Sequence, residues 1–133
     1  MSHGVSSKKF IELAGNAAEG IMLPSGRVLV ADLLPNSDKQ KKPLQAFIRD
    51  YRRHFNKEGD HFAGHAWDAM MLLKTAIERG GDNPSAIRSQ LEKIRNFAGI
   101  GGIFNYSRTD HSGLGKDAFV LVEVKNKDWV LVR

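Results

Sequence analysis

Apolar residues in the middle of the chain recur with the period of a helix. Pro43 suits the first turn of a helix, where its missing N–H costs nothing. The residues that follow it place their apolar side chains along a single face, which predicts an amphipathic helix from residue 43 to residue 59. The residues of this apolar face are Leu44, Phe47, Ile48, Tyr51 and Phe55.

Two further helices are predicted after this one. Asp60 is a favourable N-cap for a helix that ends at Gly80 and Gly81, and Asn83 followed by Pro84 begins the next. Apolar residues form a stripe along the first of these two helices, and we expect the stripe to be buried. Its members are Phe62, Ala66, Ala69, Met70, Leu73, Ala76 and Ile77, whereas the shorter helix carries Ile87, Leu91 and Ile94.

Short apolar runs between turn residues predict strands towards both ends of the chain. Residues 20–23 and 28–31 are predicted strands, separated by a turn at 24–26 and preceded by a weak helical stretch at 6–14. Residues 103–106 predict another strand, and residues 119–124 and 129–132 predict the two strands of a hairpin. The sequence therefore predicts an α/β chain with three main helices, short strands and a C-terminal β-hairpin.

Length and composition set the class of protein. The 133 residues are 41% hydrophobic and 26% charged, which is typical of one globular domain or a piece of a larger one. Cysteine is absent from the sequence, which excludes disulfides, zinc ribbons and thiol catalysis. We expect residues 1–9, which begin with a polar segment without the pattern of a signal peptide, to be a disordered start.

The positive charge is local. The formal net charge is +5, but the excess comes from residues 39–57, where Asp50 is the single acidic residue. The aromatic residues of this stretch do not form the interleaved stacking pattern that single-strand binders use, so we predict no nucleic-acid partner. We expect a solvated helix face, and contact with an anionic partner is the alternative.

Three histidines and two aspartates around residue 60 suggest a metal site. His61 and His65 lie one helical turn apart, and Asp68 follows after almost another turn. The residue after His61 is Phe62, not the glutamate that follows the first histidine in zinc proteases with this spacing. We therefore predict no metal and expect ordinary residues of the helix surface or its first turn; the set is His54, Asp60, His61, His65 and Asp68.

Two other segments resemble catalytic or phosphate-binding motifs. Asp110, His111 and Ser112 are adjacent in sequence, but catalytic triads are assembled in space, so a turn is expected here. The glycine segment 99–102 follows a helix and lacks the Lys-Ser/Thr ending of a phosphate loop, so we expect it to give the backbone room in a tight connection.

Trp67 is the candidate ligand-binding residue. It lies beside the apolar stripe of its helix, where an aromatic ring can form a flat wall for a ligand. The alternative is a further aromatic residue of the core, and the spacing leaves both open.

Several motifs in order resemble a known family. They include a Trp67-Asp68-Ala69 helix start, the ending Ala76-Ile77-Glu78-Arg79-Gly80 and the segment Asp110-His111-Ser112-Gly113-Leu114. Ala17-Ala18-Glu19-Gly20-Ile21 and Phe97-x-Gly99-x-x-Gly102 belong to the same set. Over residues 10–133 the chain resembles the C-terminal part of the extracytoplasmic solute-binding proteins of branched-chain amino-acid-type ABC transporters, the leucine/isoleucine/valine-binding family.

The resemblance implies the periplasmic-binding-protein type I fold, in which two α/β lobes close on a small solute and then dock on a membrane permease. It implies a periplasmic location, an amino acid or related small carboxylate as solute, no cofactor and no catalysis. It also places Trp67 where the family usually has a Tyr or Phe that lines the cleft.

The same resemblance implies that neither lobe is complete in this chain. Residues 10–30 and 117–133 are expected in one lobe and residues 31–110 in the other, without the first part of the family's sequence. Strands and apolar faces without their neighbours lead us to predict a homo-oligomer. A ligand-sensing domain of the same fold and, less favoured, a small hydrolase that uses Asp110, His111 or the pair His61 and His65 are the alternative functions.

Overall fold

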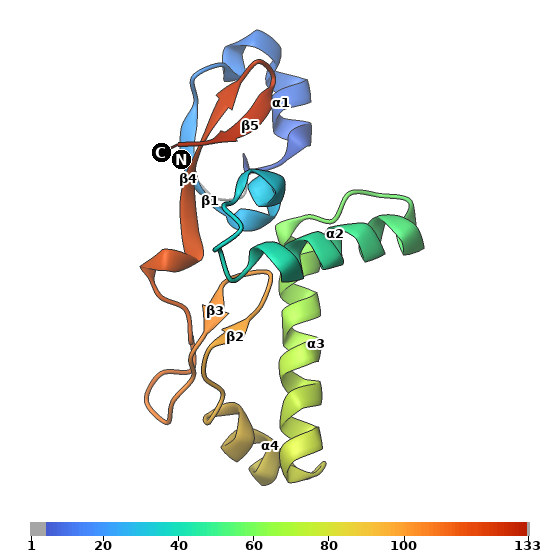
Figure 1. The fold of residues 1–133 in the computed structure, drawn as a ribbon, viewed down its shortest axis with the longest axis vertical. Coiled ribbons are helices and arrows are strands. Elements are labelled where there is room, and N and C mark those ends of the chain that lie inside the picture. Colours follow the sequence, from blue (N-terminus) through green and yellow to red (C-terminus); the bar gives the residue numbers. More distant parts are fainter. Residues whose placement is uncertain (1–4, 133) are drawn as a thin grey trace.

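The computed structural model describes residues 5–132, with a small sheet at one end and three helices at the other (Figure 1). The sheet has the strand order β1-β4-β5, and both pairings are antiparallel. The strands are β1 (Met22–Gly26), β4 (Phe119–Lys125) and β5 (Asp128–Leu131). The short helix α1 (Lys8–Ala14) and the 3-10 helix η2 (Gly15–Ala18) pack beside them.

The predicted C-terminal hairpin is confirmed. Its turn residues Asn126 and Lys127 both have positive φ values, 54° and 62°, which match the right-handed twist of the two strands. The carboxylate of Glu19 accepts the N–H groups of Asn126 at 3.1 Å and Lys127 at 2.7 Å. A residue from the start of the chain therefore holds the turn at its end.

The predictions for the N-terminal strands were partly wrong. The first strand begins at Met22 and continues through Pro24 to Gly26, where a turn was predicted. Proline is accommodated because β1 is an edge strand, so its missing N–H leaves no partner unpaired. Residues 28–31 belong to the 3-10 helix η3 (Arg27–Leu33), not to a strand. A short run buried on several sides has no periodicity that distinguishes the two structures.

The sheet buries one face against the first part of the chain. Val122 and Val124 of β4 are at most 1% exposed, whereas Phe119 and Leu121 on the other face are about half exposed. The core on the buried face combines side chains from both ends of the sequence. It contains Ile11, Ala18, Leu23, Val30, Val122, Val124 and Trp129.

The three main helices are confirmed close to their predicted bounds. They are α2 (Lys41–Phe55), α3 (His61–Gly80) and α4 (Pro84–Leu91). The side chain of Asp60 accepts the N–H of Ala63, and Asn83 accepts that of Ala86, so both predicted N-caps form. In Figure 1, α2 crosses the upper end of α3, and α4 packs against the lower end.

The buried face of α3 is not the predicted one. Phe62 and Met70 of the apolar stripe are 66% and 65% exposed, and Ala76 is the one stripe member in the core. The helix instead turns a face with two polar side chains towards the rest of the described chain. The buried residues are His61, Gly64, Asp68, Leu72 and Ala76.

A two-stranded hairpin connects the helices back to the sheet. It consists of β2 (Phe97–Ala98), which was not predicted, and β3 (Ile103–Phe104), which is shorter than the predicted strand. Phe104 packs with Leu72 and Ile94 in a separate small core. The 3-10 helix η4 (Lys116–Ala118) then leads into β4.

Part of the predicted disordered start lies outside the described residues, which begin at Val5. The remainder is ordered, since the Ser7 side chain accepts the N–H of Phe10 and Lys8 and Lys9 form the first turn of α1. Among the described residues, no helix combines the length and apolar character needed to cross a membrane.

Candidate functional site

The two ends of the molecule meet at the start of α3. Residues 27–40 lead from β1 to α2, and residues 105–118 lead back from β3 to β4. Between these connections lies a small pocket of about 70 Å³. Its lining combines the sheet end, α3 and the glycine segment: Gly26, Val28, His61, His65, Ile100, Gly101, Leu114, Ala118 and Phe119. We call this region the waist.

Asp68 fixes the glycine segment against α3. The N–H of Ile100 donates to Oδ1 of Asp68 and the N–H of Gly101 donates to Oδ2, both at 2.7 Å. The Asp68 side chain is 2% exposed. A Cβ atom at position 99 would lie 2.7 Å from the Asp68 carboxylate. The predicted role of these glycines, which was to give the backbone room, is therefore confirmed at Gly99.

The environment of Asp68 shifts its acidity. Burial raises the pKa of the Asp68 carboxyl, while the N–H groups of Gly101 and Ile100 and the nearby His65 lower it, with a net upward shift. The hydrogen bonds therefore offset only part of the desolvation of the charged form. In a phosphate loop, backbone N–H groups bind the ligand. Here the N–H groups of Ile100 and Gly101 already bind the Asp68 carboxylate.

A series of polar contacts continues from this segment across the waist. Gln40, which is 2% exposed, donates from Nε2 to the carbonyl oxygens of Gly99 at 2.9 Å and Ile100 at 3.4 Å. Its own N–H donates to Asp38 at 2.8 Å, and Asp38 pairs with Arg27 at 3.1 Å. Side chains of the first connection and of α3 thus hold the glycine segment at the waist.

The residues considered for a metal site are divided. His65 is exposed at the rim of the waist pocket, whereas His61 is 6% exposed and Asp68 is buried with its backbone donors. The expectation of helix-surface or first-turn residues was wrong for the buried Asp68, whereas His61 lies in the first turn of α3 as expected but is buried. Within residues 5–132, no group of three or more acidic or histidine side chains is placed to hold a metal ion.

The predicted turn at Asp110, His111 and Ser112 is confirmed. Oδ1 of Asp110 accepts the N–H groups of Ser112 at 2.9 Å and Gly113 at 3.0 Å, which is an Asx turn. His111 instead points towards Glu92, with Nε2 and Oε1 3.3 Å apart. The three side chains are not arranged as a catalytic triad.

Trp67 lies on α3 beside α2, away from the waist pocket. Its ring is 6.3 Å from that of Phe47, and 49% of the residue is exposed. Tyr51 and Phe55 continue the aromatic row along α2, with ring centroids 4.7 Å apart. Trp67 therefore packs against one aromatic neighbour, and about half of its surface remains exposed to solvent.

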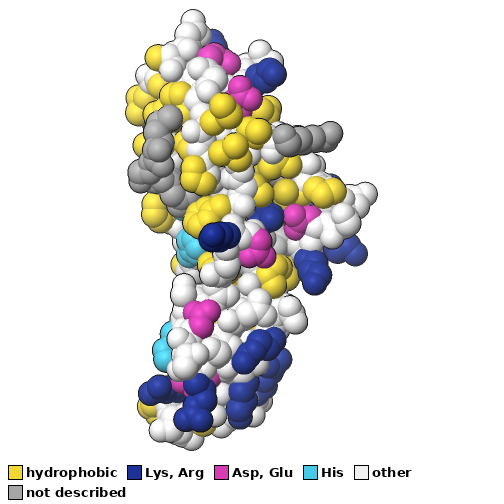
Figure 2. All heavy atoms as spheres, turned by 90° about the vertical axis from the view of Figure 1, so that its left-hand side faces the viewer, with side chains coloured by type: hydrophobic (Ala, Val, Ile, Leu, Met, Phe, Trp, Pro, Cys, Tyr) yellow, Lys and Arg dark blue, Asp and Glu magenta, His cyan; other side chains and the backbone are white. Residues whose placement is uncertain are grey.

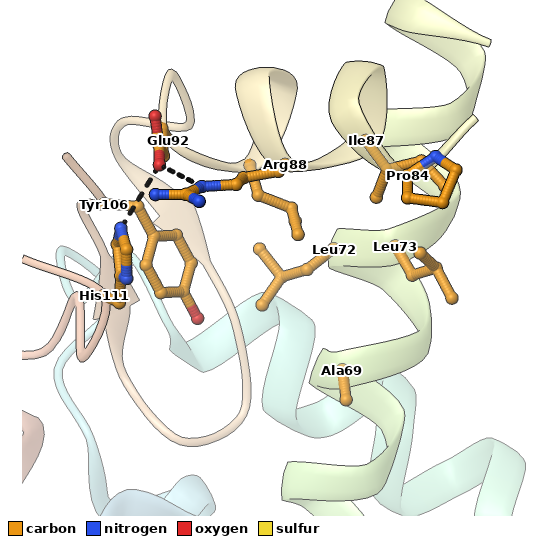
Figure 3. Close-up of a pocket in the computed structure, with 10 residues that line it drawn as sticks. Ala69, Leu72, Leu73, Pro84, Ile87, Arg88, Glu92, Tyr106 and His111 are labelled. Carbon is orange, nitrogen blue, oxygen red and sulfur yellow. Dashed lines mark hydrogen bonds and ion pairs between the residues drawn. The ribbon is translucent and has the colours of Figure 1, made fainter. Parts of the chain in front are cut away.

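A larger groove of about 770 Å³ opens between α3 and α4 (Figure 3). Leu72, Leu73 and Ile87 form its apolar walls. At its polar end Arg88 and His111 both contact Glu92, and the ring of Tyr106 lies between His111 and Leu72 in the view. Burial, followed by the charges of two aspartates, raises the pKa of the Tyr106 hydroxyl.

Comparison with known families identifies the fold. The sequence model of a family described as periplasmic binding protein matches residues 1–128. The chain belongs to this periplasmic binding protein family, and its architecture is a partial type I fold. No curated protein matches the chain.

Solved structures support the same assignment. An extracellular ligand-binding receptor from Rhodopseudomonas palustris HaA2 is similar at 30% identity with a TM-score of 0.86, over 98% of this chain and 39% of that one. Rp1789 from R. palustris CGA009 has 28% identity, a TM-score of 0.86 and the same coverage. A leucine binding protein from Thermotoga maritima MSB8 has 27% identity and a TM-score of 0.71, over 98% and 35%. The chain thus spans about two fifths of these proteins.

The sequence interpretation missed the polar contacts at the waist. Neither Gln40 nor Arg27 was singled out, because neither residue belongs to a periodic pattern. The one available signal was Asp68, a carboxylate four residues from both Gly64 and Leu72 on one face of the helix.

Replacing Asp68 by alanine is predicted to lower the free energy of unfolding by about 1–3 kcal/mol. Two buried N–H groups lose their acceptor, and relief of the carboxylate's desolvation offsets part of that loss. Asp82→Ala, at an exposed aspartate, is the matched control and should change stability by less than about 0.5 kcal/mol. Urea denaturation measures both, and equal midpoints for the two variants would contradict the assigned role.

Proposed function

We propose that this chain is part of an extracytoplasmic solute-binding component of an ABC transporter for branched-chain or related amino acids. Membership of the periplasmic binding protein family supports a role in binding a small molecule. The similar T. maritima protein is a leucine binding protein, which supports the class of solute. The proposed location is the periplasm, and the proposed partners are the solute and the membrane permease, with no cofactor.

The waist is the observation that carries this proposal. Residues 10–30 and 117–133 form one lobe and residues 31–110 the other, with the two connections as the hinge. This division is supported by the sheet core, which draws only on the first and last segments of the chain. Rotation about the waist closes the lobes on the solute and excludes water, as in hinged binding proteins. Binding, not bond chemistry, is the role of such a cleft.

Trp67 is the proposed ligand-binding residue of this chain. Its half-exposed ring, supported from behind by Phe47, supports a role as an apolar wall. A rigid, flat surface suits the branched side chain of a small amino acid or an aromatic one. Trp67 and Phe47 offer no charged group to the carboxylate and ammonium groups of the solute, so other residues bind them.

A sensing role is the second candidate. The similar R. palustris HaA2 protein is named an extracellular ligand-binding receptor, and this wording supports a domain that reports a ligand as well as one that delivers it. The genomic sequence around this coding region separates the two functions. A lipoprotein leader indicates transport, and a linked transmembrane or DNA-binding segment indicates sensing.

Branched-chain amino acids are predicted to shift the NMR signal of the Trp67 indole N–H. Titration with leucine, isoleucine and valine to about 10 mM detects the weak binding expected when few polar contacts contribute. Trp129, which is 3% exposed in the sheet core, is the internal control and should not move. Lysine is the control ligand.

Two results would count against this assignment. An unchanged Trp67 signal with every branched-chain amino acid removes Trp67 from the site. Micromolar binding by calorimetry, combined with that unchanged signal, places a complete site elsewhere in the chain.

Self-association is predicted for the isolated chain. Phe62 and Met70 are 66% and 65% exposed on α3 and Leu73 and Ile77 are 37% and 38% exposed, and burying this apolar stripe between two copies is favourable. Size-exclusion chromatography with light scattering should give a mass above 14.8 kDa, the mass of one chain. Met70→Lys should shift the mass towards the monomer, whereas the control Leu13→Lys, on the opposite end of the molecule, should not. A monomer at all concentrations contradicts the prediction.

A further inference from the structure

Positively charged side chains gather at the end of the molecule farthest from the sheet. Figure 2 shows Lys and Arg side chains concentrated at the lower end of the face it presents. They surround an open hollow of about 1010 Å³ between α4 and the loop that follows β3. The cationic lining residues are Arg88, Lys93, Arg95 and Arg108, and hydroxyl groups come from Ser85, Ser89, Ser107 and Thr109.

The charge of this hollow is almost uncompensated. Glu92 is the one carboxylate among the lining residues, and its side chain is 14% exposed. Hydrogen bonding to Arg88 contributes most to a lowered pKa of Glu92, and His111 adds to it. The lowered pKa favours the charged carboxylate, and Arg88 and His111 both contact its Oε1.

Two cations remain available for a partner. Among the described residues, the side chains of Lys93 and Arg108 form no hydrogen bond or ion pair, and both residues are exposed. Arg95 donates from Nη1 to the carbonyl oxygens of Glu92 and Ile94, both at 2.9 Å. These contacts orient its guanidinium group without neutralising it.

The basic stretch around α2 lacks this concentration. Arg49 pairs with Asp50 at 3.1 Å and Arg52 with Glu58 at 2.8 Å, so part of its charge is compensated locally. Lys41 donates to the carbonyl oxygen of Leu34 at 2.7 Å. Lys39, Lys42, Arg53 and Lys57 of that stretch are exposed as well, but they are spread over α2 and the residues on either side of it.

We propose that the hollow at the α4 end docks an acidic protein surface, through carboxylates that meet its guanidinium groups and hydroxyls. Planar guanidinium groups bind carboxylates with two parallel hydrogen bonds, and hydroxyls complete the shell. The lining has no aromatic ring on which a nucleobase could stack and no apolar side chain to enter a lipid layer. A polar, hydrated contact of this kind associates quickly and releases easily. Docking at this hollow requires no bound solute and does not involve Trp67. It is therefore a second interaction, beyond the proposed binding of a solute.

Fluorescence anisotropy with a labelled decaglutamate peptide tests this surface. The double variant Lys93→Glu with Arg108→Glu should weaken binding by about tenfold or more, because two attractive contacts become repulsive. The variant Arg53→Glu with Lys57→Glu changes the net charge equally at exposed positions of the α2 region and should bind like the original chain. Raising NaCl from about 50 to about 300 mM should weaken binding strongly, since exposed charges are screened. Circular dichroism establishes that both variants fold.

Three results would overturn the proposal. Equal weakening in both double variants shows a response to net charge alone. Peptide binding that is undetectable at low salt shows that the hollow does not hold carboxylates. Tighter binding to phosphatidylglycerol vesicles or to a single-stranded oligonucleotide than to the peptide, lost in the Lys93 and Arg108 variant, assigns the hollow to a lipid or nucleic-acid partner instead.

Discussion

The carboxylate of Asp68 is the contact on which the arrangement of the molecule depends. It joins α3 to the glycine segment through the N–H groups of Ile100 and Gly101, in a place where water is excluded. Since buried backbone donors without an acceptor are costly, the carboxylate fixes both the rotation of α3 and the path of the chain back to the sheet. Gln40 then connects the same segment to the residues before α2.

This constraint explains why the sequence predicted the helix caps and the hairpin but not the buried face of α3. Helix caps and the hairpin turn are local, so Asp60, Asn83 and the residues around Asn126 indicated them directly. The buried face of α3 depends on contacts 32 and 33 residues away in sequence. Hydrophobic periodicity therefore favoured the stripe through Phe62, which in the described structure is exposed. The sequence identified Trp67 as a candidate ligand-binding residue. It did not indicate that the ring of Phe47, from another helix, lies against it.

The two proposed binding functions use different surfaces of the molecule. In the proposed solute-binding protein the waist is the hinge, and the aromatic face of Trp67 lies on the helix that Asp68 contacts. The basic hollow lies at the other end of the helical part, where it can meet a partner without obstructing the hinge. Family membership fixes the architecture, and the particular solute and partner depend on a few side chains on these surfaces.

Hydrogen exchange at two amides tests the role of Asp68 most directly. The N–H groups of Ile100 and Gly101 should be protected in the original chain and should exchange at least about tenfold faster in Asp68→Ala. The N–H of Ala63, which Asp60 caps at 2.9 Å, is the reference and should keep its rate. Unchanged protection of both amides in the variant would contradict the account, because another group would then be their acceptor.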